Sequence, residues 1–141
     1  MATFTLDVVK PDGPVLSEAV DEVVIPGALR MFGVLPGHAP MLAQLGVGAV
    51  TYKQRGQEHA VAVEGGFCEV RPDRVTVLAE RAERADQIDL ERAERARRKA
   101  AEHLASIEHE KPAEEIDAVR RKLRRAEVRL ETVRGAGRGP H

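Results

Sequence analysis

Arginine side chains in the C-terminal part of the chain have the type and the spacing to bind an anion. Arg125 and Arg129 are one helical turn apart, and Arg92 stands earlier, beside the small residue Ala93. If the two segments fold as an antiparallel pair of helices, three guanidinium groups come together, and guanidinium groups offer fixed, paired donors to phosphate oxygens. The pattern predicts a site for a phosphate-bearing ligand, and the alternative is a capped helical turn with solvated arginines.

The other reactive side chains do not form a recognisable catalytic motif. The sequence has no glycine-rich P-loop, so we do not expect it to hydrolyse nucleoside triphosphates. Cys68 lies in an expected strand without a histidine partner in the motif, which is typical of a buried, unreactive thiol. The histidines show no metal-ligand spacing, and we assign no metal to His38, His59, His103, His109 or His141. We therefore expect neither an enzyme nor a required cofactor.

The elements that must position these residues change in kind between Ala85 and Asp86. Residues 1–85 contain all four aromatic residues, the single cysteine, six of the eight prolines and nine of the twelve glycines. Residues 86–134 contain no glycine, no aromatic residue and one proline, with 13 Lys or Arg against 12 Asp or Glu. We expect a β domain over residues 1–85, a helical domain over 86–134 and a disordered tail over 135–141.

Charge and hydropathy exclude several classes of partner. The net charge is −1, which gives no reason to expect a nucleic acid or an anionic membrane as the main partner. No stretch approaches the roughly 18 apolar residues that a membrane span needs. A single cysteine and the lack of a signal-peptide pattern indicate a reducing, cytoplasmic setting.

In the first part, short apolar runs alternate with turn residues. Residues 3–10 form a β-branched run that ends at a Pro-Asp-Gly-Pro turn, and residues 15–25 suit one further strand that ends at Pro-Gly. Two hairpins are expected: residues 47–53 with 59–63, and residues 67–70 with 74–78. The pattern predicts an antiparallel β-sandwich or flattened barrel.

The second part has helical periodicity, which makes the fold class α+β. Asp86 is the expected N-cap of a first helix, and Pro112 the expected start of a second. Apolar residues recur at spacings of three and four at Ala93, Ala96, Ala100, Leu104 and Ile107, and then at Ile116, Val119, Leu123, Ala126, Leu130 and Val133. Because the first stripe is mostly alanine, it offers little area to bury. We therefore expect an antiparallel hairpin that can open.

Four ordered segments resemble the epsilon-subunit family of bacterial F-type ATP synthases. They are residues 6–11 (LDVVKP), 33–41 (GVLPGHAPM), 65–78 (GGFCEVRPDRVTVL) and 88–93 (IDLERA). The second is the most specific, since an L-P-G-H-x-P loop is unusual outside that family. One departure is the loop over residues 27–32, which carries Arg30 and apolar bulk where the family often has glycine and acidic residues.

The resemblance implies a non-catalytic subunit of the central stalk that couples proton-driven rotation to ATP synthesis. Its partners would be the gamma subunit, the ring of c subunits and the catalytic alpha and beta subunits. It would be peripheral, at the cytoplasmic face of the bacterial inner membrane, and attached only through the complex. The hairpin would either lie folded on the sandwich or extend into the alpha and beta head, where it opposes ATP hydrolysis.

The resemblance also implies two sets of site residues. A rotor-docking loop would comprise Leu35, Pro36, Gly37, His38, Pro40 and Met41, although by itself this segment suits a rigid turn. A regulatory ATP site that keeps the hairpin folded would comprise Glu83, Ile88, Asp89, Arg92, Ala93, Arg125 and Arg129. In that site Glu83 would accept from the adenine amino group, and Ala93 would leave room for the base.

Two alternatives follow from the residues alone. The basic cluster at Arg120, Arg121, Lys122, Arg124 and Arg125 suits either a solvated helix face or a surface for acidic partners. The whole chain also suits a stand-alone β-sandwich interaction module with a coiled-coil arm. The lack of aromatic residues after Phe67 counts against nucleic-acid binding by such a module.

Overall fold

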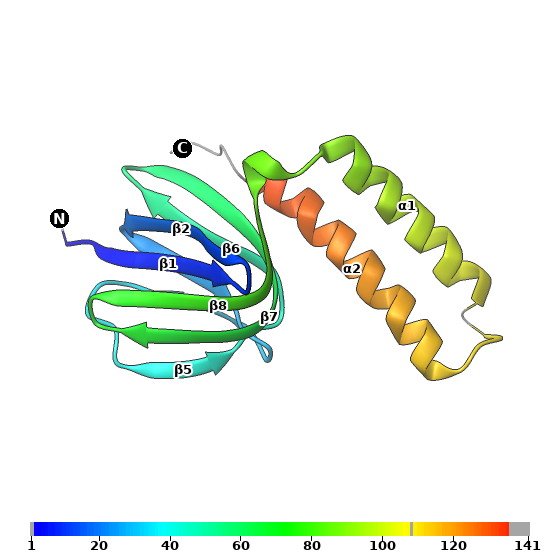
Figure 1. The fold of residues 1–141 in the computed structure, drawn as a ribbon, viewed down its shortest axis with the longest axis horizontal. Helices are drawn as coiled ribbons and strands as arrows, with labels where there is room; N and C mark the ends of the chain where they lie inside the picture. The colour runs from blue at the N-terminus through cyan, green and yellow to red at the C-terminus, as the bar shows by residue number, and fades with distance from the viewer. Residues whose placement is uncertain (1, 108, 136–141) are drawn as a thin grey trace.

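The structure, a computed structural model, describes residues 2–107 and 109–135. A sandwich of eight strands carries a hairpin of two helices that projects from one end (Figure 1), which confirms the predicted fold class. The strands are β1 (Phe4–Lys10), β2 (Gly13–Val20), β3 (Glu22–Pro26), β4 (Met31–Val34), β5 (Met41–Gln44), β6 (Val47–Gln54), β7 (Gln57–Arg71) and β8 (Arg74–Arg84). A 3-10 turn, η1 (Ala85–Gln87), leads to the helices α1 (Leu90–Ile107) and α2 (Ala113–Gly135). Most of the expected tail, residues 136–141, lies outside the described residues.

The strand order is β2-β1-β8-β7-β6-β3-β4, and β5 also pairs with β7. These pairs are antiparallel except for β1 and β8, which run parallel, so the prediction of an antiparallel sandwich holds for all but one pair. The long strand β7 pairs first with β6, over residues 57–64, and then with β5, over residues 67–70. It can do so because two glycines, Gly65 and Gly66, take positive φ angles of 66° and 107° between these stretches.

The main core is aliphatic, as the low aromatic content predicts. Alternate residues of β1 (Phe4, Leu6 and Val8) point inward and are buried, as are Val75 and Val77 of the parallel neighbour β8. Cys68 of β7 is also fully buried in this core, as expected for a small apolar residue without a catalytic role.

The expected strand over residues 15–25 is two strands. Asp21 separates β2 from β3, and these pair with β1 and β6 respectively. The backbone amide of Asp21 donates to the carbonyl oxygen of Lys53 at 2.8 Å, and its carboxylate accepts from the backbone amide of Arg55 at 3.2 Å. These bonds turn the chain at a point where the hydrophobic pattern alone shows only a short interruption.

Both expected hairpins are present inside longer strands. The turn between β6 and β7 is formed by Arg55 and Gly56, which both have positive φ angles. The turn between β7 and β8 is formed by Pro72 and Asp73. The strands β7 and β8 continue well beyond the apolar run that predicted the second hairpin, and β8 runs directly into η1.

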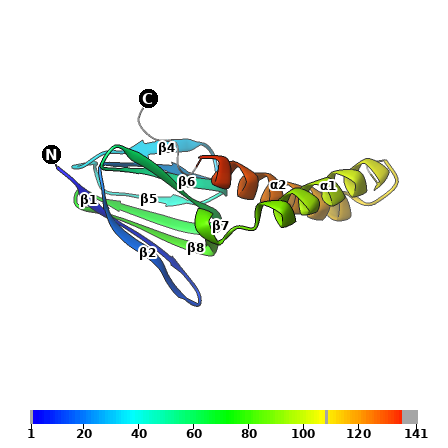
Figure 2. The same ribbon diagram turned by 90° about the horizontal axis from the view of Figure 1, so that it is seen from above.

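The first helix begins later than expected. Asp86 lies in η1, and Asp89 caps α1, since its carboxylate accepts from the backbone amide of Arg92 at 3.1 Å. The helices then run antiparallel, away from the sandwich and back to it (Figure 2). The last turns of α2 lie against the sandwich, whereas the connection between the helices is at the far tip (Figure 1).

The second helix buries two faces. Val119, Ala126 and Leu130 belong to the predicted stripe, which packs against α1. Val128 and Thr132 are also buried, on a face that the single-stripe prediction does not include. This second face lies on β6 and β7. A small second core results, in which Val128 and Leu130 of α2 meet Ala62 of β7, Ile88 of the linker and Ala93 of α1.

Candidate functional site

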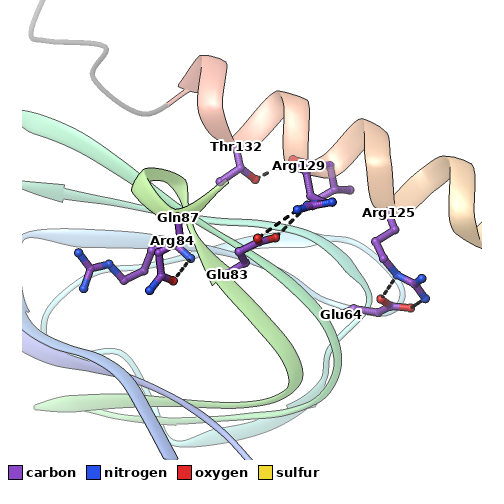
Figure 3. A network of polar contacts seen from close by, with 8 residues as sticks. Glu64, Glu83, Arg84, Gln87, Arg125, Arg129 and Thr132 are labelled. Atoms are coloured by element: carbon purple, nitrogen blue, oxygen red, sulfur yellow. Dashed lines mark hydrogen bonds and ion pairs between the residues drawn. The ribbon is translucent and has the colours of Figure 1, made fainter. Parts of the chain in front are cut away.

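Two arginines of α2 reach down to two carboxylates of the sandwich (Figure 3). Arg125 donates to the carboxylate of Glu64 on β7 from Nε at 2.7 Å and from Nη2 at 3.1 Å. One turn further along α2, Arg129 donates to the carboxylate of Glu83 on β8 from Nε at 2.9 Å and from Nη2 at 3.1 Å. Both pairs have the two-pronged geometry that makes arginine–carboxylate contacts directional.

The pairs are partly shielded from solvent. The side chain of Glu64 is 19% exposed and that of Arg129 is 23% exposed, whereas Arg125 and Glu83 are each 34% exposed. The hydrogen bonds from Arg125 lower the pKa of the Glu64 carboxyl, against the opposing effect of burial, and the charges of Arg81 and Arg121 add to the lowering. The same contact raises the pKa of Arg125. Both groups are therefore charged around neutral pH.

A cavity of about 480 Å³ lies under α2, between the two ion pairs. Its apolar walls include Val47, Ala62 and Val128, and its polar walls include the four paired side chains together with Lys10, Arg81 and Gln87. A second cavity, of about 320 Å³, lies between the helices and is lined by Ala96, Lys99, Ala100, His103, Val119, Lys122, Arg125, Ala126 and Arg129. Arg125 and Arg129 thus line both cavities, and their surroundings carry more cations than carboxylates.

The predicted phosphate-binding residues come together only in part. Arg125, Arg129 and Glu83 do converge, but the guanidinium groups of Arg125 and Arg129 are engaged by carboxylates. The side chain of Arg92 is exposed and is not among the residues that line either cavity. The expected cluster of three guanidinium groups is therefore a pair in this conformation.

The remaining members of the predicted set have structural positions. Ile88 and Ala93 are buried in the small second core, so the space beside Ala93 is filled by protein atoms and not open to a base. Asp89 caps α1 through its side chain. In this conformation these three residues build the joint between the sandwich and the hairpin.

The predicted phosphate-binding set did not include Glu64, Lys99 or Lys122, although Lys122 belongs to the predicted basic cluster. Glu64 lies next to the glycine pair of β7, and its pairing with Arg125, 61 residues away in sequence, follows only from the way α2 docks. A signal for this docking face does exist: Arg125, Val128, Arg129 and Thr132 follow one another at helical spacing. A search for one apolar stripe per helix overlooks a face that is half charged.

The loop that contains the predicted docking residues lies beside the β7–β8 turn, at the end of the sandwich away from the hairpin (Figure 1). The backbone amide of Gly37 donates to the carbonyl oxygen of Pro72 at 2.9 Å, which ties the loop to the β7–β8 turn. Gly37 has a φ of 84°, and His38 Nδ1 lies 2.7 Å from the carbonyl oxygen of Ala39. Leu35 and Met41 are exposed. The loop is thus a fixed turn that presents apolar side chains.

Further apolar side chains are exposed on the sandwich. Phe67 and Leu78 are cross-strand partners on the outer face of β7 and β8, and Leu42 of the adjoining strand β5 is 71% exposed. In the atypical loop over residues 27–32, Leu29 is 100% exposed and Met31 is 55% exposed. Several exposed large apolar side chains on one domain are typical of a subunit that binds other proteins.

The basic cluster of α2 is only partly balanced within the helix. Arg124 donates to Glu131 at 3.1 Å, and Arg120 lies 3.7 Å from Asp117. Arg125 turns away from this surface toward Glu64. Among residues 2–107 and 109–135, no three His, Cys, Asp or Glu side chains gather as metal ligands. Neither helix of the described part has the length and apolar character needed to cross a bilayer.

A β-sandwich that carries a two-helix hairpin at one end and exposes an apolar loop at the other has the architecture of the delta and epsilon subunits of rotary ATP synthases. Residues 3–85 match the sequence family described as "ATP synthase, Delta/Epsilon chain, beta-sandwich domain". The ATP synthase epsilon chain of Nitratidesulfovibrio vulgaris is 48% identical over 132 residues, which cover 92% of this chain and 94% of that one. The epsilon chain of Bacillus licheniformis is 43% identical over 136 residues, which cover 95% of this chain and all of that one. The chain belongs to the ATP synthase epsilon family, whose members are non-catalytic subunits of the central stalk.

The fold also resembles solved structures of mitochondrial enzymes. A chain in the Euglena gracilis ATP synthase (OSCP/F1/c-ring, rotational state 1) superposes with a TM-score of 0.68 at 24% identity, covering 96% of this chain and 79% of that one. A chain in the Tetrahymena thermophila central stalk and c-ring gives a TM-score of 0.56 at 7% identity, covering 94% of this chain and 97% of that one. At these identities the likeness supports the fold.

Proposed function

We propose that this subunit couples proton-driven rotation to ATP synthesis and restrains ATP hydrolysis through its hairpin. The observation that carries the proposal is that full-length epsilon chains match both the sandwich and the hairpin, over 92% and 95% of this chain. The sandwich binds the gamma subunit and the c ring, and the hairpin reaches the alpha and beta subunits. The protein acts at the cytoplasmic face of the bacterial inner membrane, peripherally and through the complex.

The sandwich has surface that suits rotor contact. The loop containing Leu35, Pro36, Gly37, His38, Pro40 and Met41 is held by its prolines and by the hydrogen bond to Pro72, so that it loses little conformational entropy when it binds. The exposed side chains of Leu42, Phe67 and Leu78 supply apolar area on the neighbouring face.

The hairpin has the properties of an element that moves. It is joined to the sandwich by the short segment of η1, and α2 makes its main contacts with β6 and β7 through its last turns. The second core is small and contains two alanines, Ala62 and Ala93. Release of the hairpin therefore exposes little apolar surface and costs little free energy.

Deletion of the hairpin tests the regulatory role. ATP synthase reconstituted with residues 1–85 should hydrolyse ATP faster than the enzyme with the full chain, because the element that opposes hydrolysis is gone. ATP-driven proton pumping should persist, because the sandwich remains on the rotor. Equal hydrolysis rates for the two enzymes would remove the inhibitory role, whereas loss of pumping with normal assembly would place a coupling role in the hairpin.

We further propose that ATP binds at the site shared by the two cavities and favours the folded hairpin. Arg125 and Arg129 would hold the phosphate groups through the N–H donors that their contacts with Glu64 and Glu83 do not use, so the ion pairs stay formed. Lys99 and Lys122 would add positive charge from the groove between the helices. Glu83 near the end of β8, Asp89 at the cap of α1 and Arg92 in its first turn would complete the site on the sandwich side. A ligand that contacts both parts binds the folded state better and shifts the population toward it.

A titration of the full chain with Mg and ATP tests this site. The distance between a donor on the sandwich and an acceptor on the hairpin should fall in a saturable manner at millimolar ATP or below. Arg129→Ala should weaken the apparent affinity about tenfold, since it removes a charged, two-pronged phosphate contact. Arg98→Ala, an exposed substitution on α1 outside both cavities, is the matched control. No saturable change in the unmodified chain would contradict the site.

A further inference from the structure

We propose that the ion pairs Arg125–Glu64 and Arg129–Glu83 act together as an electrostatic latch that sets how often the hairpin leaves the sandwich. In the docked state, as described here, α2 lies on β6 and β7 and both pairs are formed. In the undocked state the hairpin is released and neither pair can form. The inference deepens the proposed regulation, but it concerns a property of the isolated chain.

The geometry of these pairs means that they form only when the hairpin is docked. They join residues 61 and 46 positions apart in the sequence, and each links α2 to a different strand. The arginines are one helical turn apart and lie on the same face as Val128 and Thr132, the two residues that α2 buries outside its main stripe. Both pairs therefore break whenever this face of α2 lifts away from the sandwich, and they break together.

Ion pairs within the helices behave differently. Arg124–Glu131 and Arg97–Glu94 each join residues of a single helix and persist whether or not the hairpin is docked. They contribute to the helices but not to the docking equilibrium. The chain therefore contains matched pairs that separate the effect of an ion pair on helix stability from its effect on docking.

Apolar contact alone stabilises the docked hairpin only weakly. Ala62 is the sandwich residue that is buried in the second core, and Val47 packs against it while remaining half-buried. An exposed ion pair contributes little to stability in water. These two pairs contribute more to stability than an exposed pair does, because they are bidentate and partly shielded from solvent. Their side chains are between 19% and 34% exposed, at the rim of a cavity. With so small an apolar contact, they make a substantial part of the docking free energy.

Fluorescence energy transfer on the full chain tests the latch. Cysteines placed at Asp12 in the β1–β2 turn and at Glu110 near the tip of the hairpin carry the dyes. Cys68 does not compete for the label because it is fully buried and its thiol pKa is raised to about 12 by burial. Glu64→Gln and Glu83→Gln should each raise the ratio of undocked to docked molecules about fivefold. Glu131→Gln removes an equal charge from the pair inside α2 and should leave the ratio unchanged.

Two further measurements make the result decisive. Raising the salt concentration should increase the undocked fraction of the unmodified chain and have much less effect on the double variant Glu64→Gln, Glu83→Gln. Exchanging the partners, as Glu64→Arg with Arg125→Glu, should recover docking that Glu64→Arg alone loses. The latch is overturned if the control variant undocks as much as the other two, or if neither salt nor the exchange has an effect. Changed docking with unchanged ATPase inhibition would contradict the proposed regulation but not the latch.

Discussion

Gly66 is the residue on which the path of β7 depends most directly. A Cβ atom at this position would lie 1.9 Å from the carbonyl oxygen of Leu78, and the φ angle of 107° is one that L-residues rarely adopt. We expect Gly66→Ala to destabilise the sandwich by about 2–4 kcal/mol, because both the backbone and the neighbouring strand must shift. Denaturant unfolding measures the loss. Gly33→Ala is the control, since its Cβ would meet no atom within 4 Å, and an equal loss there would contradict the steric explanation.

Glu64 gives docking a defined dependence on pH. Its pKa in the docked state is lowered from an ordinary value of 4.5, chiefly by the hydrogen bonds from Arg125. A carboxyl whose pKa is lowered contributes its full stabilisation above its unperturbed pKa, and loses it as the pH falls through the lowered value. The docked fraction should therefore be level near neutral pH and fall in acid.

The comparison of the chain with Glu64→Gln isolates this carboxyl. Arg125 and Arg121 face it from α2, and Arg81 faces it from β8. Other titrating groups are the same in both proteins, so the difference between their acid transitions reports on the Glu64 carboxyl. The Gln variant should start from a lower docked fraction and show a shallower acid transition in the energy-transfer signal. Identical transitions in the two proteins would show that the Glu64 pair contributes nothing to docking.

At the scale of elements, the joint between the sandwich and the helices is defined by small residues. Ala93 is fully buried among Ala62, Ile88 and Val128. Ala93→Leu should cost about 1–3 kcal/mol by overpacking this core, and the cost falls on the docked state because release of the hairpin relieves it. Energy transfer should therefore show more undocked molecules, while circular dichroism shows unchanged helix content. Ala105→Leu, on an exposed face of the same helix, should change neither signal.

The elements themselves follow from the sequence more closely than their contacts do. Alternation and turn residues predict the β1, β6 and β7 strands, and the change of composition places the start of the helical part within a few residues of Leu90. These signals are local, because period and turn chemistry depend on neighbours in the chain. The turn at Asp21 and the capping role of Asp89 were not predicted for a related reason, since a turn or a cap depends on which backbone amide a carboxylate reaches.

The candidate site depends on contacts between distant parts of the chain and was therefore only partly predictable. Arg125 and Arg129 could be chosen by residue type and helical spacing, and Glu83 by the resemblance to the epsilon family. Glu64 could not, because nothing near it in the sequence indicates that α2 will lie over β7. Ala93 was expected to leave room for a base, but it is buried, and its burial arises from the packing of three separate elements. Residue type and helical spacing indicated which arginines could act together, whereas the carboxylates that they contact follow from tertiary packing.

At the scale of the whole molecule, the main core stabilises the sandwich, and the second core stabilises the docking of the hairpin on it. The main core consists of sandwich residues alone, including Leu6, Val50 and Val77. The second core joins the sandwich to the hairpin and includes one buried sandwich residue, Ala62. Such an arrangement lets the helices change position while the sandwich keeps the shape that its partners bind.

A chain that ends at residue 85 should therefore fold. It keeps every residue of the main core and loses the docked face of α2, which contributes little to the sandwich itself. For a domain of this size, a loss of 1 kcal/mol lowers the melting temperature by about 4–8 °C, and we expect a decrease of no more than this. Differential scanning calorimetry should show one cooperative transition for the truncated chain. A truncated chain that melts far lower, or fails to fold, would show that the hairpin supports the sandwich and cannot leave it freely, which would contradict both the latch and the regulatory role proposed for the hairpin.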